Sequence, residues 1–112
     1  MEIQKRNDVT VIVMDDRFDA AVAQKLKDVV RNIAEQDRIK LVMDLAKTRF
    51  IDSSGCGALV ASLRAVIKNN GDMKIASPSA QARSLFQLTR LNKVFEIYDD
   101  VEAALKSFSQ NV

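Results

Sequence analysis

A short segment near the middle of the chain combines a carboxylate, two hydroxyls and two glycines. Residues 51–57 read Ile-Asp-Ser-Ser-Gly-Cys-Gly. A serine hydroxyl can carry a phosphoryl group, and glycine lets another molecule approach the backbone closely. The segment precedes a helical pattern, and the free N–H groups at the start of a helix attract anions. It therefore predicts either a phosphorylated or anion-binding serine, or, as the plainer alternative, residues that cap the helix.

Other residues could do chemistry, and each has a simpler interpretation. Asp15, Asp16 and Asp19 could hold Mg²⁺ through water, but a solvated turn with helix caps is favoured. Cys56 lies where a thiol pKa can fall, although a free cysteine is more often a small buried apolar residue. Gly-x-Gly at residues 55–57 resembles a dinucleotide fingerprint, but Val60 replaces the third glycine, so we expect no cofactor.

Composition excludes several classes of protein. The chain has 112 residues, of which 47% are hydrophobic and 29% charged, and a net charge of +2, which favours one domain over residues 1–112. The absence of histidine excludes imidazole-based catalysis and histidine-ligated metals. A single cysteine allows no internal disulfide. Scattered charges argue against nucleic acid, and without a signal peptide or membrane span we expect a cytoplasmic location.

Apolar spacing predicts the elements that must position the central segment. Strands are expected over 2–6, 9–14, 39–45, 73–76 and 95–98. Helices are expected over about 20–35, from after Gly55 to Asn70, over about 79–91 with Ser79 as cap, and at the C-terminus with Asp99 or Asp100 as cap. The second helix should bury Leu59, Leu63, Val66 and Ile67. The order β-β-α-β-α-β-α-β-α predicts an α/β fold with one small mixed sheet and about four helices packed on it.

The central segment resembles the Asp-Ser-Ser/Thr-Gly-x-Gly motif of STAS-domain proteins. The strand before it, residues 40–45, is similar to the strand that precedes the motif in that family. Downstream, Ser-Pro-Ser at 77–79 and Leu-Phe-Gln-Leu-Thr-Arg-Leu at 85–91 are similar to the family's Ser-Pro and Leu-Phe…Thr-Gly-Leu stretches. Length, motif position and element order also agree. The chain is therefore identified as similar to the stand-alone anti-sigma factor antagonists.

That resemblance implies a phosphorylation switch. The serine directly after the motif's aspartate is the family's usual phosphoacceptor, which makes Ser53 the expected site and Ser54 the second choice. The implied partners are a serine kinase and anti-sigma factor with a histidine-kinase-like ATPase fold, and a metal-dependent serine phosphatase. The unphosphorylated form would bind the anti-sigma factor, and phosphorylation would block binding. The implied partner surface comprises Asp19, Asp52, Ser53, Ser54, Gly55 and Gly57, on a chain that is a monomer when free.

Two positions depart from the family pattern. Asp16 stands where glycine is usual in the turn before the first helix, and Arg90 replaces the glycine of the downstream stretch. The first change would alter the choice of partner, and the second would alter a helix cap.

Two other functions stay open from the residues alone. Ser53 could be the nucleophile of a small hydrolase with Asp52 nearby, although a carboxylate activates serine poorly. The start of the helix could instead bind a nucleotide as a sensor. Ester turnover lost in Ser53→Ala would support the first, and saturable binding of ATP or GTP without a partner would support the second.

Overall fold

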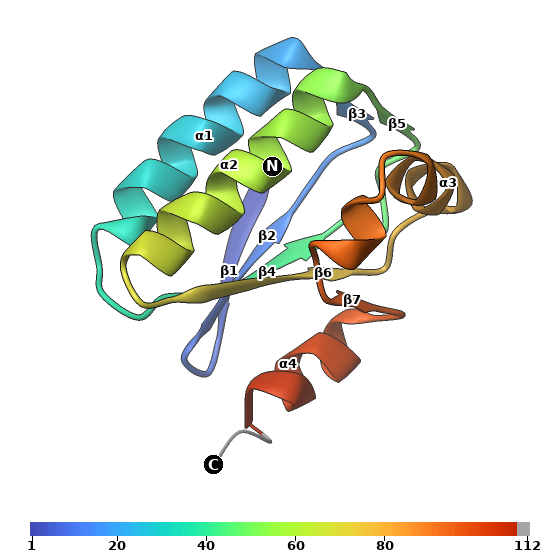
Figure 1. Cartoon of the computed structure of the whole chain (residues 1–112). Helices are drawn as coiled ribbons and strands as arrows, with labels where there is room; N and C mark the ends of the chain where they lie inside the picture. Colours follow the sequence, from blue (N-terminus) through green and yellow to red (C-terminus); the bar gives the residue numbers. More distant parts are fainter. Residues whose placement is uncertain (110–112) are drawn as a thin grey trace.

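The computed structural model describes residues 1–109 and shows strands and helices in regular alternation (Figure 1). The strands are β1 (Glu2–Arg6), β2 (Val9–Val13), β3 (Arg17–Phe18), β4 (Lys40–Asp44), β5 (Phe50–Ile51), β6 (Asp72–Ala76) and β7 (Ile97–Tyr98). The helices are α1 (Ala20–Ala34), α2 (Ser53–Lys68), α3 (Ala80–Leu88), the short 3₁₀ helix η1 (Leu91–Lys93) and α4 (Val101–Ser109).

Five strands form one mixed sheet in the order β1-β2-β4-β6-β7. β1 pairs antiparallel with β2, whereas β2, β4, β6 and β7 run parallel. Parallel neighbours require crossovers, and α1, α2 and α3 provide them. The predicted α/β fold with a five-stranded mixed sheet and four helices is therefore confirmed.

The helices cover both faces of the sheet (Figure 1): α1 and α2 lie side by side on one face, and α4 covers the other. Side chains alternate between the faces along each strand. On β2, Ile12 packs into the core beneath α1 and α2, whereas Val11 and Val13 pack beneath α4. Central strands buried on both sides explain the almost continuous apolar runs in the sequence.

The edges of the sheet are charged or short. β1 forms one edge with exposed Glu2, Lys5 and Arg6. β7, at the other edge, has two residues and comes directly after exposed Glu96.

A separate pair of two-residue strands sets the start of both long helices. β3 and β5 pair in parallel, with Arg17 opposite Phe50 and Phe18 opposite Ile51. One residue separates each strand from its helix, so α1 and α2 begin at matching positions. The sequence did not predict this pair, because two-residue strands have no measurable periodicity.

Several predicted boundaries were wrong. The second helix begins at Ser53 rather than after Gly55. The helix predicted to reach residue 91 ends at Leu88, because Arg90 adopts a left-handed conformation with φ of 60° and starts η1. Arg90, which stands where the family pattern has glycine, thus takes the left-handed conformation that glycine favours. The strand predicted over 95–98 spans only residues 97 and 98.

Ile67 contradicts the predicted buried stripe of α2. Leu59 and Val66 are fully buried and Leu63 is half-buried, but Ile67 is 55% exposed. Instead of entering the core, this apolar side chain lines a groove at the surface.

Lys74 is an unexpected buried charge on β6. Its side chain is 3% exposed and lies beneath α4. The ammonium donates to Ser107 Oγ at 2.7 Å, lies 3.2 Å from Glu96 Oε2, and stands 4.4 Å from the centre of the Phe108 ring. These contacts pair the charge and fasten α4 to the sheet.

Candidate functional site

Asp52 caps α2. Its backbone is extended, and its Oδ1 accepts the Gly55 N–H at 3.0 Å. Its carbonyl accepts the Cys56 N–H at 3.1 Å. Ser53 and Ser54 are therefore the first two residues of the helix and not its cap, which corrects the expectation that their hydroxyls could fill that role.

Ser53 lies at the surface at the start of α2. Its side chain is exposed and that of Ser54 is half-buried. The N–H groups of a helix's first turn have no partner within the helix, and this end carries a partial positive charge. The first turn of α2 holds no acidic side chain. A negative group on Ser53 would therefore meet a favourable backbone field.

The two glycines of the motif have different surroundings. A Cβ at Gly55 would lie 2.8 Å from the Phe18 carbonyl oxygen and 2.8 Å from Ile51 Cγ1. Close packing of α2 against β3 and β5 thus requires glycine there. Gly57 is exposed, and a Cβ there would meet no atom of the described residues 1–109 within 4 Å.

Asp19 occupies the matching position on α1. Its Oδ1 accepts the Val22 N–H at 3.3 Å, so it caps this helix as Asp52 caps α2. The pairing of β3 with β5 and the packing of α1 on α2 place the two capped ends next to each other. The structure therefore places Asp19 and the predicted segment 52–57 on one edge of the molecule.

Asp16 forms a bridge to the loop before the motif. Arg49 donates to its carboxylate from Nε at 2.7 Å and from Nη2 at 3.1 Å. These hydrogen bonds hold the pKa of Asp16 below its ordinary value of 3.8 and raise the pKa of Arg49. The Asp16 carbonyl also accepts the N–H groups of Arg49 and Phe50. The residue that departs from the family pattern is thus built into the support of the site.

Sequence reasoning missed a stacked pair beside Ser53. The Arg17 guanidinium lies 4.2 Å from the centre of the Phe50 ring, and Phe50 is 39% exposed. Arg17 also lies 3.7 Å from Asp19. The pair adds an aromatic and a cationic group to the same edge. No signal in the sequence could have joined them, since 33 positions separate the two residues.

The acidic residues of this edge each have a specific partner. Asp15 pairs with the Met1 ammonium, Asp16 with Arg49, and Asp19 caps α1. Within residues 1–109, no three histidine, cysteine or acidic side chains gather as metal ligands. Among the three aspartates, Asp19 is thus a helix cap.

Cys56 is buried, and its surroundings suppress ionisation. Burial raises the pKa of the thiol, and the nearby Asp52 carboxylate raises it further. The side chain therefore behaves as a small apolar residue. The hydrolase alternative gains nothing from Asp52, whose Oδ1 faces the Gly55 N–H as a helix cap. In the part of the chain that the structure describes, no helix has the length and apolar content needed to cross a bilayer.

Comparisons with known proteins agree with this fold. The STAS domain pattern matches residues 1–104. The anti-sigma-B factor antagonist of Listeria monocytogenes is 26% identical over 98 residues, which cover 87% of this chain and 86% of that protein. The anti-sigma factor antagonist SpoIIAA in its unphosphorylated form superposes with a TM-score of 0.85 at 18% identity, over 99% of this chain and 97% of that one. The phosphorylated form of the Bacillus protein SpoIIAA gives 0.75 at 18% identity, over 96% and 97%.

Proposed function

This chain belongs to the STAS domain family, and we propose that it is an anti-sigma factor antagonist switched by phosphorylation of Ser53. The observation that carries the proposal is the position of Ser53: an exposed hydroxyl on the first residue of α2, directly after the capping Asp52. The names of its relatives and the resemblance of the motif support the same function. The protein acts by binding and is not an enzyme.

The helix end explains how the fold tolerates a phosphate. A phosphoserine carries about −1.5 to −2 charges at pH 7. The free N–H groups and partial positive charge of α2 compensate for it, so the fold keeps its shape. A protein of the same fold exists in phosphorylated and unphosphorylated forms, which supports this view.

The partner protein, and not the fold of this chain, is what does not tolerate the phosphate. A surface packed over Ser53 would meet a new charge and new bulk, and Asp52 would add repulsion to any acidic group nearby. The unphosphorylated protein binds a serine kinase that is also an anti-sigma factor, with a histidine-kinase-like ATPase fold. A metal-dependent phosphatase restores that form. Losing one buried contact suffices for a tenfold change in affinity, which is about 1.4 kcal/mol.

The binding surface extends from the start of α2 to the start of α1. It comprises Asp19, Asp52, Ser53, Ser54 and Gly57, with Gly55 holding the helix close to β3 and β5. The Arg17–Phe50 pair and the Asp16–Arg49 pair lie at its margin. Because Asp16 replaces the usual glycine, the loop before α1 selects a partner particular to this chain.

The first test is a phosphosite map of the protein purified from its native cells, with and without phosphatase treatment. We expect one phosphate on Ser53 that phosphatase removes. Ser53→Ala should abolish the modification, and Ser54→Ala, its matched control, should retain it. Phosphate on Ser54 alone, or none under growth and stress alike, contradicts the proposal.

The second test measures binding to the co-purifying kinase. Unmodified protein and Ser53→Ala should bind the kinase. The affinity of the phosphorylated protein and of Ser53→Asp should be lower by about tenfold or more. Circular dichroism should show the same fold in all four. A phosphorylated protein that unfolds, or that binds as tightly as the unmodified one, contradicts the direct block.

A further inference from the structure

An apolar groove lies far along α2 from Ser53. It runs between the second half of α2 and the segment after α3, and its volume is about 560 Å³. Apolar side chains form most of its lining: Val60, Leu63, Ile67, Leu91 and Val94. Ile67 is 55% exposed and Val94 53% exposed. Exposed apolar side chains that gather in one patch often mark a binding site.

Every charged residue at this groove is positive. Arg64 and Lys68 line it from α2, and Arg90 and Lys93 stand next to Leu91 and Val94 along the chain. α2 and residues 88–95 contain no acidic residue. All four cations are exposed, and none of them takes part in an ion pair within the described residues 1–109.

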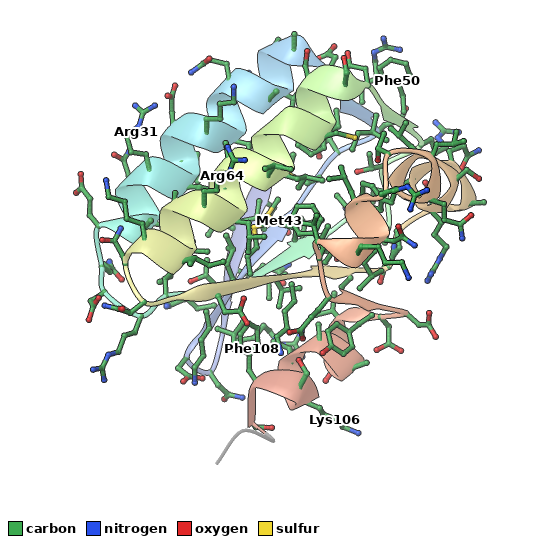
Figure 2. All side chains as sticks on the ribbon, viewed as in Figure 1. Arg31, Met43, Phe50, Arg64, Lys106 and Phe108 are labelled. Carbon is green, nitrogen blue, oxygen red and sulfur yellow. The ribbon has the colours of Figure 1, made fainter. Side chains whose placement is uncertain are left out.

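The groove continues the exposed face of α2 that begins at Ser53. Residues 53, 57, 60, 64 and 67 are spaced by three or four, so they lie along one side of the helix. Figure 2 shows Arg64 on this outward side of α2. Ser53 and Ile67 are 14 positions apart, which is about 21 Å along the helix. A molecule bound in the groove therefore need not contact Ser53.

We propose that this groove binds an acidic amphipathic helix of a partner protein. The apolar face of such a helix would place its side chains between Val60, Ile67 and Val94, in the manner of a helix held in a hydrophobic groove. Its acidic residues would then face Arg64 and Lys68, the two cations of the lining. Charge complementarity of this kind raises the association rate and fixes the orientation of the bound segment.

Charge and shape argue against the other occupants. A second copy of this chain would bring two positive rims together, and like charges repel. A hollow between two elements accepts protruding side chains, whereas a membrane surface is bound by apolar groups that project outward. Single-stranded nucleic acid is bound through aromatic stacking, and no aromatic side chain among the described residues 1–109 lines the groove.

The test uses two synthetic, fluorescently labelled helical peptides and the full chain. Both peptides carry leucines on one face. The other face carries glutamates in the first peptide and lysines in the second. Fluorescence anisotropy should show saturable binding of the glutamate peptide only. The double variant Arg64→Glu/Lys68→Glu should weaken it about tenfold or more and should bind the lysine peptide instead.

A matched variant controls for general charge effects. Lys25→Glu/Lys27→Glu changes two exposed cations of α1 in the same way and should leave binding unchanged. Ser53→Asp should also leave it unchanged, so failure of this proposal is distinct from failure of the phosphorylation switch. Ile67→Ser should weaken binding while Ile3→Ser, similarly exposed on β1, should not.

Three results would overturn the proposal. The first is equal binding of both peptides, or equal binding by the Arg64→Glu/Lys68→Glu variant. The second is a concentration-dependent dimer in analytical ultracentrifugation that Ile67→Ser abolishes. The third is retention on anionic phosphatidylglycerol vesicles that depends on Arg64 and Lys68 while the glutamate peptide does not bind.

Discussion

The starts of α1 and α2 are two versions of one construction. Each helix comes after a two-residue strand and an aspartate, and β3 and β5 hold the two in register. Both aspartates have extended backbones, with φ of −103° at Asp19 and −110° at Asp52. Each accepts the N–H three residues later through its side chain and the N–H four residues later through its carbonyl.

The two helix starts differ in the residues directly after the cap. α1 continues with Ala20, Ala21 and Val22, whereas α2 continues with two serines and Gly55. At the fourth position both are buried, Ala23 at 3% and Cys56 at 7% exposure. The cap and the buried fourth residue therefore serve folding in both helices. The hydroxyls, which only α2 has, are the groups that the proposed phosphorylation switch would use.

The largest effect is expected from a side chain at Gly55. Gly55→Ala places a Cβ against the Phe18 carbonyl oxygen, which is backbone and cannot turn away. We expect the free energy of unfolding in urea to fall by about 1–3 kcal/mol, as for other overpacked positions. Gly57→Ala is the control: it meets open space and should gain up to about 1 kcal/mol from helix propensity. Equal effects would show that α2 is not closely held by β3.

A smaller and equal effect is expected from the two caps. Asp52→Ala and Asp19→Ala should each lower the free energy of unfolding by about 1 kcal/mol, and asparagine at either position should recover most of it. Chemical denaturation of the four variants measures this. A loss at Asp52 several times that at Asp19 would mean that the two helix starts are not equivalent, and that Asp52 has a further structural role.

The smallest effect concerns the Asp16–Arg49 ion pair, which joins the residue before β3 to the residue before β5. Arg49 lowers the pKa of Asp16, so the pair stabilises the folded state above the ordinary pKa of 3.8 and this contribution is lost as the pH falls through the lower folded value. Arg49→Gln should return the Asp16 pKa toward 3.8 in an NMR titration. The free energy of unfolding of Arg49→Gln should be lower than that of wild type at pH 7, and the two values should converge in acid. A difference that persists at low pH would assign the effect to packing instead.

The sequence predicted most of the regular elements, for a physical reason. Strands such as β2 and β4 and helices such as α1 have strong apolar patterns, and Asp52 with its hydroxyl neighbours is a local signal. The shortness of β3 and β5 leaves no pattern to detect. The length of the third helix was overestimated because its apolar spacing continues past Leu88, while Arg90 takes a backbone conformation more typical of glycine.

Contacts between distant residues could not be predicted in the same way. The Asp16–Arg49 and Arg17–Phe50 pairs depend on how β3 meets β5. The exposure of Ile67 depends on how η1 passes α2, since helical spacing alone placed it in the core. Which apolar residues face a groove is decided by the neighbouring element and not by the helix that carries them.

The edges of the main sheet also affect how the protein behaves in crowded solution. A long, flat, uncharged edge strand would offer its free N–H and C=O groups to other molecules and promote aggregation. Here β1 carries Glu2, Lys5 and Arg6, and β7 ends after two residues. Neither edge is a good template for another strand. We therefore expect concentrated solutions to resist amyloid-like assembly, which leaves the helical surfaces as the places where this protein associates with others.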